Sequence, residues 1–385
     1  MRKIKIKRSF LLILIALLLS ISGCIKETYN MNMLSKKTHL SPTLAISAVK
    51  GDISFSDAVK PNDTIVFDQN KLVTFIFKKE SIIDLKATDF AKGTVVKTAV
   101  IDPGSFNLDI NDVLSHISGN FKVISPSIKF SYANAFPDSV KINLKASASR
   151  SKTTLNLNLL PFGLVKPNIP VQQPVSAVYV IDKNNSNISD LISLPPEIIN
   201  YSGTVTLTAS TKSNPGENNA LIPPHLTGSL EIQIPMELKI NNLQYTDTVD
   251  NFLKNDKPSV NDPADPANFD LLRVNLSAKN GFPLGVSVKM SLYDSSTKTI
   301  KSTVDAVGIL TPAPVDSNGK VTGVSESTAV IEFSKSFFSY VNKTDKIIFR
   351  FTLNSTGAGT QNVKIYSDYR LNFNAALVVK PDINL

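Results

Sequence analysis

Polar and apolar residues alternate along much of this chain, and the alternation predicts β-strands. Residues 155–159 read LNLNL, and residues 286–292 and 364–373 show the same period of two. This period places alternate side chains on opposite faces of a strand, as in an antiparallel sheet with one buried face. No amphipathic pattern is long enough for a helix of more than about three turns. We therefore expect an all-β protein whose short strands are separated by turns rich in Pro, Asn and Asp.

One stretch of this pattern occurs twice, at a constant offset of 146 residues. Residues 128–146 (IKFSYANAFPDSVKINLKA) align without a gap on residues 274–292 (VNLSAKNGFPLGVSVKMSL), and the apolar positions match. Each copy has an Asn-x-Phe-Pro turn, which contains Phe136 in one copy and Phe282 in the other. We expect both rings to be buried beside their turns.

The correspondence continues beyond the turns. Residues 177–181 (AVYVI) resemble residues 329–333 (AVIEF), and in each copy scattered apolar residues, a further strand and a closing pair of strands follow. The offset is too long for a stacked repeat, so the pattern predicts an internal duplication that forms two similar domains. The Asn-x-Phe-Pro turn before an alternating strand also resembles the Asn-Pro turns of LEA-type β-sandwich domains. That resemblance implies two β-sandwiches; a curved, lipid-binding sheet of the tubular type is the alternative fold.

The same patterns predict the domain boundaries. Residues 256–270 (DKPSVNDPADPANFD) contain three prolines and cannot form a central strand, so we expect a linker there. Their oxygen-rich side chains suggest calcium, but the glycine and glutamate spacing of an EF-hand is missing. The predicted organisation is a signal peptide (1–23), a flexible tether (24–43), a smaller β-rich N-terminal region (44–120), a first β-sandwich repeat (121–255), the linker (256–270) and a second β-sandwich repeat (271–385).

The N-terminus carries the most specific motif of the chain. Five basic residues precede an apolar run over residues 10–19, the layout of a secretory signal, and the run is too short to span a bilayer as a stable helix. Residues 21–24 (ISGC) then resemble the lipobox of bacterial lipoproteins. The resemblance implies cleavage after Gly23 and a mature N-terminal Cys24 that bears an N-acyl group, such as palmitate, and an S-diacylglycerol group.

Two simpler interpretations of this motif remain open: a secreted protein with an incidental cysteine, or an anchor that is never cut. We favour the lipoprotein because Cys24 is the only cysteine and stands where cleavage requires it. Several acyl chains would anchor the protein durably, since each buried methylene contributes about 0.8 kcal/mol. The resemblance implies an outer-membrane address, because the aspartate that retains enterobacterial lipoproteins at the inner membrane is replaced by Ile25. The face of that membrane is left undecided, although Lys26 and Glu27 faintly resemble surface-export tags.

Charge and cysteine content exclude several classes of function. The formal net charge of +9 falls to +4 without residues 1–23, which hold five basic residues and no acidic one. So small a surplus argues against a nucleic-acid partner. With Cys24 acylated, no thiol is left for a disulfide, a redox centre or a cysteine metal site. A hydrophobic fraction of 42% is sufficient for a core without disulfides.

Catalytic motifs are missing. The three histidines, His39, His116 and His225, lack partners at metal-ligand spacing, and no nucleophile elbow or phosphate-binding loop is present. Glu231 and Glu237 lie in predicted strands, where we expect them to face solvent. Trp is absent, which disfavours a carbohydrate platform but leaves a set of tyrosines as candidates: Tyr132, Tyr179, Tyr201, Tyr245 and Tyr293. We expect no catalytic, cofactor-binding or metal site.

These observations favour a lipid-anchored protein of the Gram-negative cell envelope that acts without catalysis as a structural, adhesive or partner-binding module. Its membrane contact would be through lipidated Cys24, and its further partner could be an envelope protein, a glycan or an apolar ligand. A second hypothesis is a carrier of a lipid or other apolar ligand, which a large apolar cavity would favour. A hydrolase of the envelope is third, and would need convergent carboxylates or a His-carboxylate pair.

Overall fold

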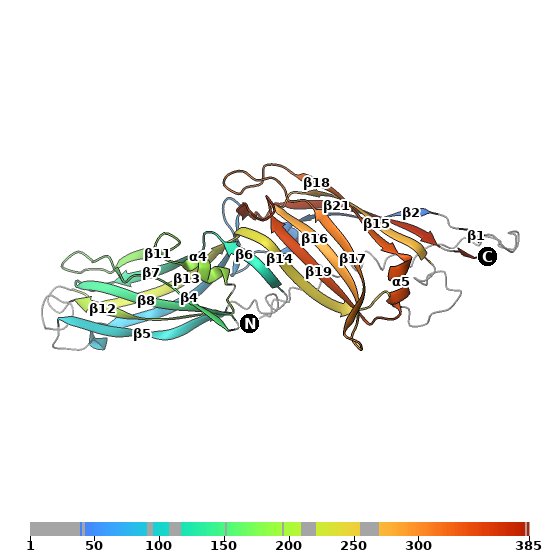
Figure 1. Cartoon of the computed structure of the whole chain (residues 1–385). Coiled ribbons are helices and arrows are strands. Elements are labelled where there is room, and N and C mark those ends of the chain that lie inside the picture. The colour runs from blue at the N-terminus through green and yellow to red at the C-terminus, as the bar shows by residue number, and fades with distance from the viewer. Residues whose placement is uncertain are drawn as a thin grey trace.

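Two β-sandwiches lie end to end and give the molecule its elongated shape (Figure 1). The computed structural model describes residues 39–40, 43–90, 95–107, 117–150, 152–194, 196–208, 221–254, 269–381 and 383–384. All strand pairs within these residues are antiparallel, which confirms the expectation of a mostly β protein with antiparallel sheets. No helix in these ranges is long and apolar enough to cross a membrane.

The first sandwich consists of two sheets. One has the strand order β11-β7-β13-β4-β3, and the other has the order β10-β8-β12-β5 with β9 paired to β8. The strands are β3 (Ile65–Phe67), β4 (Val73–Lys86), β5 (Val96–Asn107), β7 (Ser127–Asn134), β8 (Ser139–Arg150), β9 (Thr153–Asn156), β10 (Phe162–Gly163), β11 (Val175–Ile181), β12 (Ile198–Thr208) and β13 (His225–Pro235). Short helical turns η3 (Ala87–Asp89) and α4 (Ile188–Ser193) lie in the connections.

The second sandwich repeats this arrangement. Its sheets have the orders β18-β15-β21-β2 and β17-β16-β19-β14-β20, with β6 paired to β14. The elements are β2 (Leu44–Ser54), α2 (Phe55–Ala58), β6 (Ile117–Val123), β14 (Glu237–Asp250), β15 (Phe269–Asn280), β16 (Leu284–Asp294), β17 (Thr299–Leu310), β18 (Ser325–Ser334), α5 (Lys335–Val341), β19 (Lys346–Ser355), β20 (Val363–Lys364) and β21 (Arg370–Pro381). A small separate sheet pairs β1 (His39–Leu40) with β22 (Ile383–Asn384).

Corresponding strands occupy the same places in the two sandwiches. The order β11-β7-β13-β4 corresponds to β18-β15-β21-β2, and β8-β12-β5 corresponds to β16-β19-β14. In both, a helix of one to two turns follows the AVYVI or AVIEF strand and buries the scattered apolar side chains noted in the sequence. This common order fits the predicted duplication, which itself stays a prediction.

The assignment of strands to the two sandwiches differs from the predicted domain boundaries in two respects. Residues 44–120 do not form a region of their own, because β2 and β6 lie in the second sandwich whereas β3, β4 and β5 lie in the first. The first repeat was expected to close with the pair β13 and β14, but β14 also lies in the second sandwich. The physical reason is that the inner strands β21 and β19 each need a second hydrogen-bonded neighbour, which β2 and β14 supply. Most of the predicted linker, residues 256–268, lies outside the described residues.

Both Asn-x-Phe-Pro turns carry the chain from one sheet of a sandwich to the other. In the first turn, Asn134 is fully buried; its Oδ1 accepts from the N–H of Phe136 at 3.0 Å, and its Nδ2 donates to the carbonyl of Val165 at 2.9 Å. Asn280 does the same in the second turn, with the N–H of Phe282 at 2.9 Å and the carbonyl of Thr311 at 2.8 Å. The repeated asparagine thus ties its corner to a later loop.

The interiors of the two sandwiches are filled to different degrees. In the first, the inward residues of β7 and β8, including Phe130 and Ile142, are completely buried. Their counterparts in the second, Leu276 and Val288, are only half-buried, although a cluster near α5 and residues such as Val363 and Ala375 are buried there. The inward positions of β15 and β16 are therefore less completely buried than those of β7 and β8.

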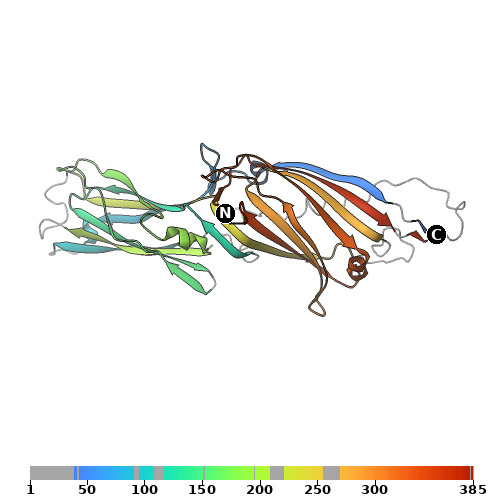
Figure 2. The same cartoon turned by 45° about the horizontal axis from the view of Figure 1, so that its top comes forward.

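Backbone hydrogen bonds join the two sandwiches at their junction. The chain crosses from one to the other four times along the order of elements. Val73 N–H donates to the carbonyl of Ile365 at 3.1 Å, Ile365 N–H donates to Met236 at 2.9 Å, and Met236 N–H donates to Val73 at 2.8 Å. Figure 2 shows the two sandwiches and the junction between them from a second direction. The two parts are therefore interleaved rather than consecutive.

Candidate functional site

A hollow of about 490 Å³ lies on the outer face of the sheet β11-β7-β13-β4 in the first sandwich. It spans all four strands. The lining is mostly small and polar: Glu80, Ser81, Ser131, Tyr132, Ala133, Ser176, Ala177, Val178, Thr227, Gly228 and Ser229. We call it the β11–β4 hollow.

Strand alternation explains why the sheet is hollowed here. The outward positions in the middle of β7 and β13 hold only Ser131, Ala133, Thr227 and Ser229, while the larger residues between them point into the core. The strands are in register, so these small residues stand side by side, Ser131 opposite Ser229 and Ala133 opposite Thr227. The result is a depression that offers several hydroxyl groups as donors and acceptors.

A β-bulge in β4 builds one wall of the hollow. Lys79 stands opposite Leu230 and Ile83 opposite Gly228, so three residues of β4 face the single residue Ser229. Within the bulge Ser81 has φ of 53°, a left-handed conformation uncommon for a residue with a side chain. Such bulges redirect side chains and are common beside functional sites. Here the bulge brings Glu80 and Ser81 into the lining.

Charged side chains flank the hydroxyl-lined centre. On one side Glu231 forms ion pairs with Lys78 at 3.2 Å and Lys129 at 4.0 Å. On the other side His225 Nε2 lies 2.5 Å from Asp84 Oδ1, and this hydrogen bond is the main cause that lowers the pKa of Asp84. Both members of that pair are exposed. The arrangement suits hydrogen bonding to a polar ligand, with a charge on either side to orient it.

The structure brings few of the candidate residues from the sequence together. Cys24 and His116 lie outside the described residues, and for His39 only the backbone pairing in β1 is described. Glu231 faces outward, as expected, but Glu237 begins β14 in the other sandwich, so the two do not form a carboxylate pair. Within the described ranges, no group of three or more His, Cys, Asp or Glu side chains could hold a metal ion.

The candidate tyrosines do not form a common platform. Tyr132 lines the hollow but is buried, and its Oη accepts from the N–H of Val165 at 3.0 Å. Tyr179 stacks on Phe162 with ring centroids 3.8 Å apart. Tyr201 is buried in the first sandwich, where burial raises its pKa, while the remaining two, Tyr245 and Tyr293, belong to strands of the second.

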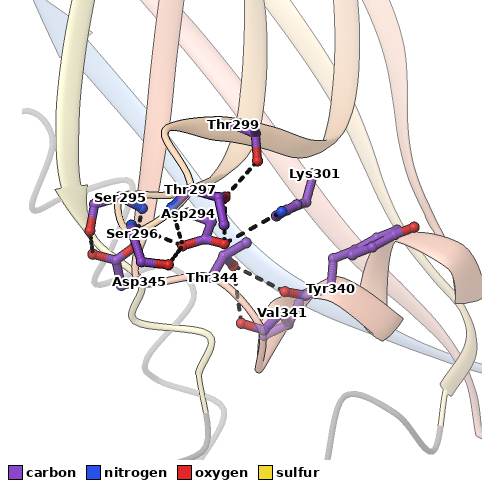
Figure 3. Close-up of polar contacts among 10 residues, drawn as sticks. All are labelled: Asp294, Ser295, Ser296, Thr297, Thr299, Lys301, Tyr340, Val341, Thr344 and Asp345. Carbon is purple, nitrogen blue, oxygen red and sulfur yellow. Dashed lines mark hydrogen bonds and ion pairs between the residues drawn. The ribbon is translucent and has the colours of Figure 1, made fainter.

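Two neighbouring carboxylates do occur, at the end of the β16–β17 hairpin, but both are engaged within the turn (Figure 3). Asp294 accepts from the hydroxyls of Ser296 at 2.6 Å and Thr297 at 2.7 Å, which hold its pKa far below the usual range. Asp345 accepts from the N–H of Ser295 at 2.8 Å and from its hydroxyl at 2.5 Å, and its pKa is lowered for the same reason. These contacts stabilise the turn, and neither Asp294 nor Asp345 is poised as a general acid.

The amino-acid sequence alone does not reveal the hollow. Small residues at outward strand positions form no recognisable sequence motif. Whether they produce a hollow depends on which residues lie beside them on the neighbouring strands. The bulge did leave a trace, because the run after residue 77 (KKESIID) breaks the alternation and puts two isoleucines in succession. Such a break is a typical sign of a bulge.

Comparison with solved structures supports the fold. A crystal structure described as "a putative secreted protein from Parabacteroides distasonis ATCC 8503" is 14% identical, covers 88% of this chain and 99% of its own, and has a TM-score of 0.50. At that identity the likeness shows a shared fold alone. The Sulfolobus Turreted Icosahedral Virus structure (12% identity, 83% of this chain and 62% of that chain, TM-score 0.16) and the infectious bursal disease virus VP2 subviral particle (9%, 96% and 77%, TM-score 0.18) are too dissimilar to support an inference. No family model and no curated protein matches the chain.

Proposed function

We propose that this chain is a lipid-anchored protein of the cell envelope, located at the outer membrane, that binds a partner without catalysis. The observation that carries the binding role is the β11–β4 hollow, whose hydroxyl-rich lining lies on the outer face of a sheet in an elongated double sandwich. The signal sequence and lipobox support the anchor. The description of the Parabacteroides structure as secreted supports a location outside the cytoplasm.

The chemistry of the hollow favours binding over turnover. Its centre offers neutral hydroxyls, and the one His-carboxylate pair at its side, His225 with Asp84, is open to solvent. A polar partner such as a glycan or a protein segment would exchange hydrogen bonds with Ser131, Thr227 and Ser229.

The anchor is tested by Cys24→Ala. We expect the variant to leave the membrane fraction, because the acyl chains would supply nearly all of the membrane affinity. Protease shaving of intact cells then distinguishes the surface from the periplasmic face. A variant that stays with membranes after a high-salt wash would contradict the lipoprotein proposal.

The hollow is tested by site-specific photo-crosslinking in intact cells. A photoreactive residue at position 131, within the hollow, should give a discrete adduct. The matched control is position 206, on the β12 strand of the opposite sheet of the same sandwich. Equal labelling at the two positions, or none at position 131, would contradict a binding role for the hollow.

A second candidate function, carriage of an apolar ligand, is favoured by the second sandwich. Its inward residues, among them Val274, Val288 and Phe351, are half-buried, whereas the corresponding residues of the first sandwich are almost completely buried. A lipid tail between those sheets would complete the packing. The test is a fluorescent fatty acid, whose binding Val288→Phe should weaken by filling the space and Ser131→Phe should leave unchanged. A probe that fails to bind the wild-type chain would exclude this function.

A further inference from the structure

The edge strand β11 lacks the features that usually prevent strands from pairing between molecules. Exposed edges are normally blunted by charged side chains, proline or bulges. β18, the counterpart of β11, carries Glu326 and Glu332, which pair with Lys279 and Arg273 at 2.9 Å. The other long edge strands, β2, β5 and β17, each contain at least one aspartate, and β5 also contains Pro103. β11 reads VSAVYVI and has no charge, no proline and no register shift.

The backbone groups on the free side of β11 can be assigned from the register. Ala135 N–H donates to the carbonyl of His225. Backbone direction alternates along a strand, so Ala133, Ser131 and Lys129 of β7 also direct their N–H and C=O groups toward β13. The residues of β7 between them direct their backbone groups toward β11, where they form hydrogen bonds with the backbone of Val175, Ala177, Tyr179 and Ile181. The N–H and C=O groups that point away from the sheet therefore belong to Ser176, Val178 and Val180.

A side-chain contact supports this assignment. Asn185, in the turn after β11, donates from Nδ2 to the carbonyl of Val180 at 2.8 Å, so this carbonyl does point away from β7. Within the described part of the chain, no strand pairs with β11 on that side. Apolar side chains are exposed along the same strand, with Val178 at 54% and Val180 at 42% exposure.

We infer that β11 pairs with β11 of a second copy of this chain, antiparallel about a two-fold axis at Val178. This register places Tyr179 opposite Ala177 of the second copy and Ile181 opposite Val175, so a large residue meets a smaller one in each case. Val178 meets its own equivalent, and Val180 meets Ser176. The strand is self-complementary in size, which favours a second copy over an unrelated peptide.

The charges next to β11 are compatible with the same pairing. Asp182 and Lys183 follow the strand, whereas Gln173 and Pro174 precede it. Antiparallel pairing therefore sets each charged end opposite a neutral one, and no like charges meet across the axis. The two five-stranded sheets would become one continuous sheet with two β11–β4 hollows on its surface, because the pairing lies in the plane of the sheet and leaves the outer face uncovered.

Seven paired residues on each side form a small interface, and interfaces below about 1,200 Å² are typical of weak complexes. Anchoring copies on one membrane would raise their effective concentration and so favour the dimer. This second point relies on the proposed anchor, but the pairing itself does not. A monomeric result in solution thus leaves the anchor proposal intact, and failure of the anchor leaves the pairing testable.

The test compares Val178→Lys with Val330→Lys by sedimentation velocity of the purified full chain over a wide concentration range. Val330 is the matched control, since it stands at the corresponding place on β18 and is 56% exposed. We expect a concentration-dependent dimer for the wild type and for Val330→Lys. Val178→Lys should weaken it about tenfold or more, because two like charges then stand directly opposite.

A second variant separates pairing from misfolding. In the Cys24→Ala background, Val178→Cys should form a disulfide-linked dimer under mild oxidation and Val330→Cys should remain monomeric. A wild-type chain that stays monomeric at every concentration would overturn the inference. So would a dimer that Val178→Lys leaves intact, or equal crosslinking at positions 178 and 330.

Discussion

At the scale of single residues, the buried amides of Asn134 and Asn280 set the geometry of two corners. Each accepts from the N–H two residues ahead and donates to a carbonyl about thirty residues further along, so one side chain fixes both a turn and a loop. Aspartate could accept in the same way but would lack the donor. Both the oxygen and the nitrogen of the side-chain amide are used, which explains why asparagine occupies this position in both copies of the Asn-x-Phe-Pro turn.

Removing this amide should be costly in the first sandwich. Asn134→Ala leaves the carbonyl of Val165 and the N–H of Phe136 without their partner, and we expect a loss of about 2–3 kcal/mol in the free energy of unfolding. Urea unfolding checks this value. The exposed Asn372 provides the control, since Asn372→Ala should change stability by less than about 0.5 kcal/mol. Equal effects of the two substitutions would show that burial of the amide contributes nothing.

The two repeated phenylalanines should differ in their contribution to stability. Phe136 is fully buried and packs edge-to-face on Phe90 at 5.5 Å, so Phe136→Ala should cost about 3–5 kcal/mol. Phe282 contacts Tyr369 at 6.1 Å but is only half-buried, against our expectation from the sequence, and Phe282→Ala should cost clearly less. Thermal or urea unfolding of the two variants makes the comparison. A larger loss for Phe282→Ala would contradict the packing described here.

Tyr369 makes stability depend on alkaline pH. Burial raises the pKa of its phenol to about 12, while the N–H of Val321 donates to its Oη at 2.9 Å. An unfolded tyrosine titrates near about 10. Between these values the folded chain holds a proton that the unfolded chain has lost, so stability is complete below pH 10 and falls as pH rises toward 12. Unfolding midpoints from pH 8 to 12 should fall less steeply for Tyr369→Phe; an identical slope would exclude this residue as a cause.

At the scale of elements, the sequence predicted the strands better than their partners. Alternation identified β7, β8, β15 and β16 and the turns between them, because one buried face imposes a period of two wherever the strand is placed. It could not show which sheet a strand joins. The same alternating pattern fits β14 equally well beside β13 or beside β19, and only the unpaired backbone of β19 decides between them.

The bulge of β4 shows a similar limit for the candidate site. A break in alternation indicates that a strand is irregular, but the depth of the β11–β4 hollow comes from small residues on three other strands. These residues are far apart in sequence and unremarkable individually. The N-terminal motif is the opposite case: the lipobox is local, so its prediction needs no fold at all.

At the scale of the whole molecule, the interleaved topology changes what a break in the chain would do. If the sandwiches were consecutive, a cut within residues 256–268 would release two folded halves. In the structure, the piece that ends before the cut still contains β2 and β14, which pair with β21 and β19 of the other piece. The second piece therefore lacks two strands of its sheets, whereas the first piece holds the whole first sandwich.

We expect the nicked protein to stay together. A protease recognition site inserted into residues 256–268 should yield, after cleavage, one particle with the mass of the whole chain, because β14 and β2 keep their ladders to β19 and β21. Size-exclusion chromatography with light scattering measures this mass. Residues 271–385 expressed alone should lack strand-rich circular dichroism, since the inner strands β19 and β21 would each expose an unpaired edge. The matched control is co-expression of residues 1–268 with residues 271–385, which should restore the fold. If the nicked pieces separate and each unfolds cooperatively, the β14–β19 and β2–β21 ladders are dispensable, and the chain consists of two independent domains.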